Sequence, residues 1–347
     1  MNSRRASLTR REAIRAAVAA GLVTVLPARL RADDTGNVRE RVTLVLVNDL
    51  DRMGDVKGRG GHARLAAVAK AERARGNTLL IHAGDALSPS ILSGFDKGFH
   101  IIEMLNRIRP DVFTPGNHDF DHGGDNFRAR VQQAAFDVVA ANIFERDGQP
   151  VARLKPTKLV EVGKVRIGFV GVTTEETVYL SKPDDIGFKP AVEIAAEVAR
   201  RLRAEGADIV VAVTHIGFAD DMKLVRDGAA DVVLSGHDHN LVTFWNGKVA
   251  LVESASQADY VTPVDLDIEI TQEGGRKRVS FTPTVRPIDT RRVEPDPEIA
   301  AMIAGYEAEL DKELSVVVGK SETPLDTRSS LMRSQETAFG NLVCDAM

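Results

Sequence analysis

Seven side chains able to bind a divalent metal ion follow short apolar segments of the chain. They are Asp49, Asp51, Asp85, Asn117, His215, His237 and His239. Carboxylate, amide and imidazole groups suit hard or borderline ions such as Mn, Zn, Mg or Co. Two such ions about 3.5–4 Å apart, bridged by one carboxylate, activate a water molecule and stabilise an in-line displacement at phosphorus. The residues therefore predict a site for two divalent metal ions that hydrolyses a phosphate ester.

Each of these residue types has a simpler explanation when it is taken alone. Asp49 or Asp85 by itself is typical of a turn or a helix cap, and a single histidine such as His215 is common in cores and on surfaces. Gly236-His237-Asp238-His239 is a stronger signal, because two imidazoles two residues apart beside a glycine rarely serve packing. Its combination with the earlier Gly116-Asn117-His118-Asp119 indicates a metal site. No role is assigned to the other histidines, which are His62, His82, His100 and His122.

Short apolar segments that indicate buried strands precede the candidate ligands. The predicted strands are Val42–Val47, Thr78–His82, Val112–Thr114, Val165–Val172, Ile209–Val213 and Val232–Leu234, with helices at Ala63–Arg75, Phe99–Ile108 and Val192–Glu205. Pro263–Ile270 and Val279–Val285 alternate apolar and polar residues, as antiparallel strands do. This order predicts a mixed α/β layered fold whose ligands bind at strand C-terminal ends. Since side chains two apart share a face of an extended segment, we expect Asp49 and Asp51 on one face.

The first 32 residues have the composition of an export signal. Four arginines occur among the first eleven residues, and the apolar stretch 16–28 that follows is too short to span a bilayer comfortably. Thr9-Arg10-Arg11-Glu12-Ala13-Ile14 resembles a twin-arginine signal, although a general secretory signal or an amphipathic helix would share these features. Cleavage after Ala32 would remove seven arginines and one glutamate, and would take the net charge from −5 to −11. We expect a periplasmic or secreted protein without stable membrane insertion.

Composition excludes several other classes of protein. The 347 residues are 43% hydrophobic, which is enough for a large core, and the net charge of −5 argues against nucleic-acid binding. Cys344 is the single cysteine, so the chain has neither an internal disulfide nor a cysteine-based zinc site. The expected partner is a small phosphate ester. Nothing in the sequence indicates the oligomeric state.

Five segments together resemble the conserved blocks of calcineurin-like metallophosphoesterases. They are Asn48-Asp49, Gly84-Asp85, Gly116-Asn117-His118-Asp119, Thr214-His215 and Gly236-His237-Asp238-His239. Their spacing, and the Phe120-Asp121 that follows the third block, are similar to the secreted bacterial 5'-nucleotidase / 2',3'-cyclic phosphodiesterase branch. The resemblance extends from Val42 to Val285 and implies a four-layer α/β/β/α sandwich with a dinuclear metal site at the strand ends. It also implies the ligand sets, with Asp85 bridging, Asn117, His215 and His237 on one ion, and Asp49 and His239 on the other.

The resemblance implies hydrolysis of a phosphate ester, and of a nucleotide in particular, by a metal-bound hydroxide. His118 would stabilise the developing charge or protonate the leaving group, and Asp121 would orient it, because a carboxylate partner favours the imidazolium form. Alternatively, His118 only supports the ligands from outside. Asn117, His118 and Arg333 are the candidate substrate contacts. Whether the ester is a monoester or a cyclic diester is left open.

Two features depart from the family pattern. Asp51 stands where the family usually has histidine, which predicts a preference for a harder ion such as Mn or Mg, unless Asp51 points away. The predicted catalytic domain covers 40–290, and a linker helix covers 295–316. Residues 317–347 resemble only the truncated start of a C-terminal nucleotidase domain, and we expect Leu342-Val343 to be disordered.

Two other functions fit part of the pattern. The first is a thiosulfonate hydrolase of sulfur oxidation, because a related twin-arginine-exported branch uses a similar dimetal scaffold. The second is a non-catalytic binding module with a degraded site, which Asp51 and the shortened C-terminal region suggest. Activity on a thiosulfate-linked substrate would indicate the first, and a folded protein that binds no metal would indicate the second.

Overall fold

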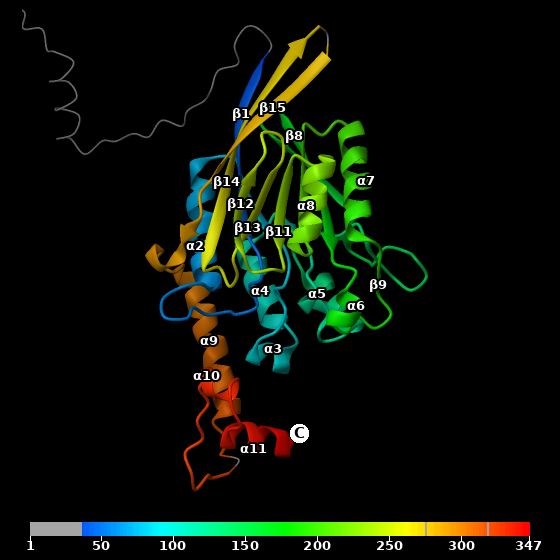
Figure 1. Cartoon of the computed structure of the whole chain (residues 1–347). Helices are drawn as coiled ribbons and strands as arrows, with labels where there is room; N and C mark the ends of the chain where they lie inside the picture. Colours follow the sequence, from blue (N-terminus) through cyan, green and yellow to red (C-terminus); the bar gives the residue numbers. More distant parts are fainter. Residues whose placement is uncertain (1–36, 275, 318) are drawn as a thin grey trace, which may run out of the picture. The chain divides into compact units, whose positions relative to one another are not determined.

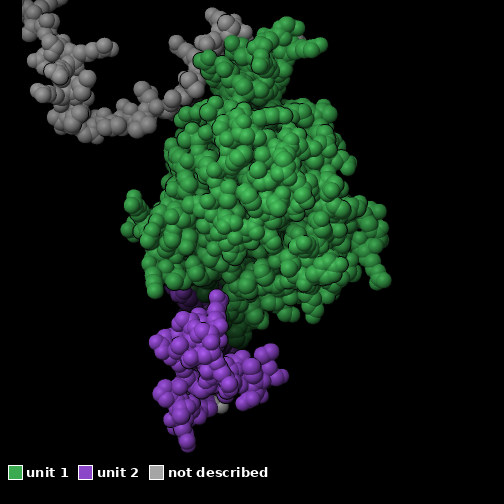
Figure 2. Space-filling model, in the orientation of Figure 1, with its two compact units in different colours: residues 1–303 green, residues 304–347 purple. Residues whose placement is uncertain are grey.

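The computed structural model describes residues 37–274, 276–317 and 319–347 (Figure 1). The predicted signal peptide, residues 1–32, lies outside them. The chain divides into two compact units, one ending at Ile303 and one comprising Ala304–Met347 (Figure 2). The predicted domain limits of 40–290, 295–316 and 317–347 stay predictions. No helix in the described ranges is long and apolar enough to cross a membrane.

Two β-sheets lie at the centre of the first unit. One runs in the order β15-β14-β1-β2-β3-β4-β6, with β16 beside β14, and the other in the order β12-β13-β11-β10-β8-β7 (Figure 1). The first sheet contains β1 (Val38–Val47), β2 (Thr78–His82), β3 (Val112–Phe113), β4 (Val138–Val139), β6 (Leu154–Lys155), β14 (Tyr260–Glu273), β15 (Arg276–Val285) and β16 (Ile288–Asp289). The second contains β7 (Thr157–Val162), β8 (Val165–Thr173), β10 (Ile209–His215), β11 (Val232–Gly236), β12 (Leu241–Trp245) and β13 (Ala250–Ser254). A separate short pair is β5 (Ile143–Phe144) with β9 (Gly187–Phe188).

Helices cover the outer face of each sheet. The first sheet is covered by α2 (His62–Arg75), α4 (Phe99–Ile108) and α5 (Gly124–Gln133), and the second by α7 (Ala191–Ala204) and α8 (Phe218–Asp227). The remaining helices are α3 (Ile91–Asp96), η1 (His118–Phe120), α6 (Thr177–Leu180), η2 (Thr290–Arg292), α9 (Pro297–Leu314), α10 (Ser329–Met332) and α11 (Ala338–Ala346). Leu342-Val343 lies within α11, so the expectation of disorder there is wrong. Thr337 caps this helix by accepting a hydrogen bond from the Gly340 N–H.

Three apolar cores separate four layers, which confirms the predicted α/β/β/α sandwich. Along β1, Leu44 and Leu46 point between the two sheets, whereas Val45 and Val47 point toward the helices. A third core lies between the second sheet and the helices α7 and α8. Because both faces of each sheet are covered, the central strands are continuously apolar rather than alternating. Burial of each such side chain stabilises the fold by about 1.5–3 kcal/mol.

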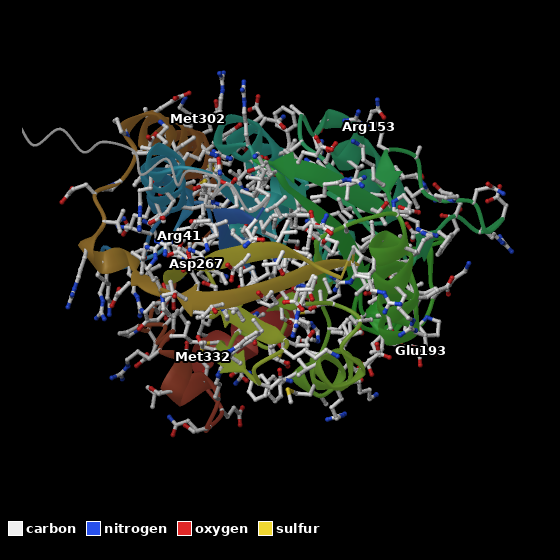
Figure 3. The ribbon with its side chains drawn as sticks, turned by 90° about the horizontal axis from the view of Figure 1, so that it is seen from above. Arg41, Arg153, Glu193, Asp267, Met302 and Met332 are labelled. Atoms are coloured by element: carbon white, nitrogen blue, oxygen red, sulfur yellow. The ribbon has the colours of Figure 1, made fainter. Side chains whose placement is uncertain are left out.

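β1 begins at Val38, four residues earlier than its apolar segment predicts. These first residues pair with β14, and Arg41 lies opposite Asp267 (Figure 3). The Arg41 guanidinium donates to both carboxylate oxygens of Asp267, at 2.6 and 2.8 Å. Exposed ion pairs of this kind contribute at most about 1 kcal/mol. Backbone pairing to β14 therefore extends the strand beyond its buried part.

Buried histidines lie close to the first sheet, outside the predicted metal site. His62 begins α2 and His82 ends β2, and both are fully buried. Burial, together with the charge of His100, lowers the pKa of His62 from 6.5 to about 3. Burial likewise lowers the pKa of His82 to about 3. Both imidazoles are therefore neutral in the folded protein at mildly acidic pH.

The free energy of unfolding is expected to fall as the pH is lowered from 6.5. The unfolded chain binds a proton on His62 that the folded protein does not, so this stabilisation is complete above pH 6.5 and is lost toward pH 3. The loss from this residue is about 2 kcal/mol at about pH 5. Urea unfolding at several pH values would measure it. Below about pH 6, the slope of the unfolding free energy against pH should be shallower in His62→Gln than in the wild type, by about 1.4 kcal/mol per pH unit. Equal slopes in the two proteins would contradict the prediction.

Candidate metal centre

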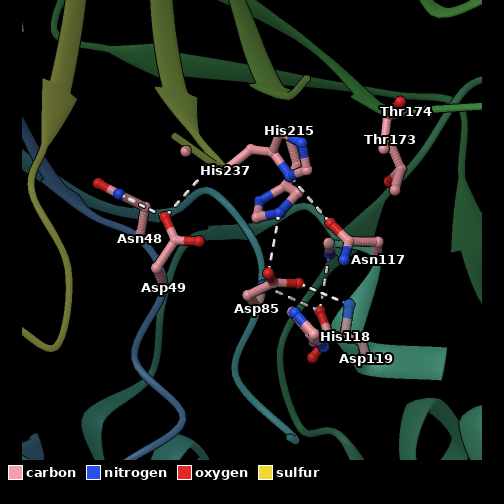
Figure 4. A network of polar contacts seen from close by, with 12 residues as sticks. Asn48, Asp49, Asp85, Asn117, His118, Asp119, Thr173, Thr174, His215 and His237 are labelled. Atoms are coloured by element: carbon pink, nitrogen blue, oxygen red, sulfur yellow. Dashed lines mark hydrogen bonds and ion pairs between the residues drawn. The ribbon is translucent and has the colours of Figure 1, made fainter. Parts of the chain in front are cut away.

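The C-terminal ends of β1, β2, β3, β10 and β11 bring the predicted ligands to one place (Figure 4). Ligand atoms of Asp49, Asp85 and His215 all lie within 4.8 Å of one another, and the three residues are buried. Asp49 follows β1 and Asp85 follows β2, while His215 is the last residue of β10. Because β1 and β2 are parallel neighbours in one sheet and β10 belongs to the facing sheet, the site lies where the two sheets meet at their C-terminal ends.

The other predicted ligands surround these three. His239 Nε2 lies 3.2 Å from Asp49 Oδ1. His237 donates its backbone N–H to Asp49 Oδ2 at 3.0 Å, and its Nδ1 lies 2.9 Å from Asn117 Oδ1. Each of six of the seven predicted residues thus contacts another of them at about hydrogen-bond length, with Asp85 and His215 in contact at 3.1 Å. Their assignment as metal ligands stays a prediction.

The backbone at this edge is held in an uncommon conformation. The φ angles of Asp49, Asp85, His237 and His239 are 51°, 55°, 94° and 60°. Left-handed φ values are rare for residues with a side chain and cost about 1–2 kcal/mol each. Residues in such conformations concentrate at functional sites, where the surrounding structure enforces them. Here the four turns direct side chains back across the strand ends.

Asp51 is not among the three residues whose ligand atoms lie within 4.8 Å of one another. β1 ends at Val47 and Asp49 turns the chain out of the extended conformation, so the reason for expecting Asp49 and Asp51 on one face does not hold. Their common face stays a prediction. The Asp51 carboxylate accepts a hydrogen bond from the side chain of Gln257. Partial burial raises the pKa of this carboxyl group, and the charge of Asp85 adds to the effect. Its metal contact stays a prediction.

Two motif glycines are required by close approach. A Cβ atom on Gly84 would lie 2.5 Å from His215 Nδ1, and Gly84 has a φ of +90°. A Cβ atom on Gly236 would lie 2.5 Å from the Ala83 carbonyl oxygen and 2.9 Å from Asn48 Cβ. Glycine is the residue that tolerates both the contacts and the conformation. The glycines therefore allow the strand ends of the two sheets to approach each other.

The chemistry of the donors fits a divalent cation. Asp49 Oδ1 and His215 Nε2 are buried and form no well-aligned hydrogen bond; their polar neighbours are His239 at 3.2 Å and Asp85 at 3.1 Å. His215 Nδ1 lies 2.7 Å from the Ala83 carbonyl oxygen, which fixes the tautomer in which Nε2 carries the lone pair, as in metal-binding histidines. Burial lowers the pKa of His215, but Asp85 and Asp49 outweigh it and raise the pKa to about 10. The pocket thus attracts positive charge.

His118 and Asp121 form a pair beside the cluster, as the resemblance implies. His118 Nδ1 lies 2.8 Å from Asp121 Oδ2, and the His118 backbone N–H donates to Asp85 Oδ1 at 2.8 Å. The hydrogen bond with Asp121 raises the pKa of His118 to about 9, against a lowering by partial burial. Since Nδ1 is occupied, Nε2 is the nitrogen available to donate a proton. The catalytic role of the pair stays a prediction.

Several supporting residues received no role from the sequence. Asn48 donates from Nδ2 to Asp49 Oδ2 at 2.6 Å and accepts from the Ser254 N–H at 3.0 Å. Asp119 accepts hydrogen bonds from four backbone N–H groups, which belong to Asp85, Ala86, Leu87 and Gly116. Asn48 and Asp119 both stand inside the recognised blocks. Their position next to predicted ligands in the sequence could therefore have indicated a supporting role. Asp221 of α8, which accepts from the hydroxyls of Thr214 and Ser235, gave no such signal.

Arg333, the remaining predicted substrate contact, belongs to the second unit and directly follows α10. Its guanidinium forms no ion pair recorded among the described residues. Asn117 and His118 belong to the first unit, where the contacts above place them at the candidate centre. The substrate role of all three residues stays a prediction.

Comparisons with known proteins agree with this site. Residues 42–241 match the family of calcineurin-like phosphoesterases. A snake venom 5'-nucleotidase from Naja atra is 27% identical in an alignment of 315 residues that covers 83% of this chain and 59% of that protein. The chain therefore spans little more than half the length of this relative.

Solved structures show the same fold. The 5'-nucleotidase precursor from Thermus thermophilus superposes with a TM-score of 0.70 at 24% identity, over 89% of this chain and 66% of that one. A sulfate thiohydrolase from the same organism superposes with a TM-score of 0.66 at 19% identity, over 91% of this chain and 68% of that one. At these identities the likeness establishes the architecture. Together with the family match, it shows that the chain belongs to the calcineurin-like phosphoesterases, a family of metal-dependent enzymes, and is related to the 5'-nucleotidases.

Proposed function

We propose that the protein hydrolyses nucleotides, as a 5'-nucleotidase or cyclic phosphodiesterase, with two divalent metal ions. The observation that carries the proposal is the buried cluster of Asp49, Asp85 and His215 beside the His118–Asp121 pair. The 5'-nucleotidase relatives support the nucleotide as substrate. From residues 1–32 we also propose that the protein acts in the periplasm or outside the cell.

The residues divide the reaction between them. Asp49, Asp85, Asn117, His215, His237 and His239 would hold the ions, with Asp51 as a further candidate. When bound, the ions activate a water molecule and neutralise charge on the phosphoryl oxygens. His118 holds a proton on Nε2 for the leaving oxygen, and Asp121 keeps its ring in one orientation. Buried walls exclude bulk water from the carboxylates and so strengthen their electrostatic interactions.

A substrate screen with defined metals tests this function. The purified protein is stripped with a chelator, reloaded with Mn, Mg, Co or Zn, and assayed on nucleoside monophosphates, 2',3'-cyclic nucleotides and a thiosulfonate. We expect turnover of a nucleotide only after reloading, and faster with Mn or Mg than with Zn, because Asp51 adds an oxygen donor. Tight zinc at both positions would contradict the metal preference. If the protein hydrolyses only the thiosulfonate, the thiosulfonate rather than a nucleotide is its substrate. A folded protein that binds no metal and hydrolyses none of these compounds would indicate a binding module.

A further inference from the structure

β8 lies next to β10 in the second sheet, but none of the predicted metal ligands follows it. Its last residue, Thr173, leads into a segment that ends at Ser181 and contains α6. The Thr173 hydroxyl donates to the Pro115 carbonyl, and the Thr174 backbone N–H donates to the His215 carbonyl at 2.9 Å. Figure 4 shows Thr173 and Thr174 beside the residues of the candidate centre. The segment is therefore tied at its start to two of the loops that carry candidate ligands.

The same segment ends at the His118–Asp121 pair. Thr177 is fully buried and its hydroxyl donates to the Thr174 carbonyl at 2.6 Å, which anchors the start of α6. The Ser181 backbone N–H donates to the Thr177 carbonyl at 3.0 Å, so Ser181 is held at the end of the helical turn. From there the Ser181 hydroxyl donates to Asp121 Oδ1 at 2.6 Å. A series of hydrogen bonds thus connects the end of β8 to Asp121.

Asp121 is bound through both of its carboxylate oxygens. Oδ2 takes the contact with His118 Nδ1 at 2.8 Å, and Oδ1 takes the Ser181 hydroxyl. A carboxylate held at both ends cannot rotate freely about its Cβ–Cγ bond, whereas one held only by the histidine can. Hydroxyl donors fix its orientation without neutralising its charge.

We propose that Ser181 is a positioning residue, which orients Asp121 so that Asp121 holds the His118 ring in place for protonation of the leaving oxygen. This inference rests on the proposed function, because it assigns Ser181 to the same reaction. β8 then contributes to the centre, as the neighbouring β10 does. Whereas β10 carries a predicted metal ligand, β8 leads to a residue that supports protonation of the leaving group. Ser181 touches neither the ester nor the ions and acts only through Asp121.

Leaving-group dependence separates this role from a structural one. A nucleoside leaves as an alkoxide and needs a proton, whereas nitrophenolate leaves readily without one. We expect Ser181→Ala to lower kcat/KM about 5- to 10-fold for a nucleoside monophosphate, as for loss of one typical hydrogen bond, and less than about 2-fold for nitrophenyl phosphate. Ser181→Thr, which keeps the hydroxyl, should recover most of the loss. Tyr179→Ala is the matched control, because Tyr179 is 88% exposed on the same helix.

The outcomes distinguish the inference from the proposed function. Equal losses on both esters, or no loss on either, would overturn the role of Ser181. Metal content and melting temperature are measured in parallel, and loss of bound metal from Ser181→Ala would also overturn it by showing a structural role. Absence of turnover of both esters by the metal-loaded wild type would contradict the proposed function itself. Ser181 is partly exposed at a helix end, so alanine there removes little packing.

Discussion

Replacement of Asp85 by asparagine is expected to lower phosphoesterase activity by about 10³-fold or more and to remove bound metal from the protein. Asp85 Oδ2 lies 3.1 Å from His215 Nε2, and Oδ1 accepts the His118 N–H at 2.8 Å. Asparagine keeps the acceptor at Oδ1 but removes the negative charge that would bridge two cations. Its side chain also tolerates the left-handed φ of 55° better than alanine would. The effect should therefore come from lost charge rather than from a changed loop.

Metal content per chain after dialysis, together with kcat/KM, measures this effect. The matched control is Asp208→Asn. Asp208 is also buried, but it precedes β10 and so lies at the opposite, N-terminal end of that strand, where it accepts the Arg166 N–H at 2.9 Å. We expect Asp208→Asn to lose stability and to retain metal and activity. Addition of Mn should raise the melting temperature of the wild type and of Asp208→Asn, but much less that of Asp85→Asn. Full metal content in Asp85→Asn would show that Asp85 is not a ligand.

The fold and the cluster could be predicted because they rest on local patterns. β2 and α4 have the predicted bounds, since an apolar segment between polar residues defines a short buried element. The four layers follow from strands that are apolar on both faces and helices that are apolar on one. Asp49 and Asp85 converge because the parallel strands β1 and β2 end at one edge of their sheet, and His215 meets them from the end of β10 in the facing sheet.

Features that depend on distant contacts could not be predicted in this way. Asp49 turns the chain out of β1, and only the packing around it shows that the Asp51 carboxylate accepts a hydrogen bond from Gln257, 206 residues later. β12 is short and exposed, so its pairing with β13 leaves no clear alternation in the sequence. Ser181 stands in a polar loop pattern without a motif, and its partner Asp121 is 60 residues earlier. Long-range hydrogen bonds of this kind leave no local pattern.

Changing His118 to alanine is expected to lower kcat for a nucleoside monophosphate by about 10²–10⁴-fold, the usual contribution of a general acid. The loss should be far smaller for nitrophenyl phosphate, whose leaving group needs no proton. The His118 side chain is 39% exposed, so its removal leaves the core and the metal ligands in place. Equal losses on the two esters would show instead that His118 only supports the ligands. Unchanged metal content is the control.

Substitution of Asp121, the partner of His118, provides a second test. The direction in which it should shift the pH profile of the rate follows from the pKa of His118. The hydrogen bond with Asp121 raises the pKa of His118 to about 9, so the imidazolium persists through neutral pH. An acid is active below its pKa and inactive above it. Asp121→Asn should therefore move the alkaline limb of the nucleotide rate profile to lower pH. Because Asp121 acts through His118, adding Asp121→Asn to His118→Ala should cost nothing more, and additive losses would show that Asp121 acts independently.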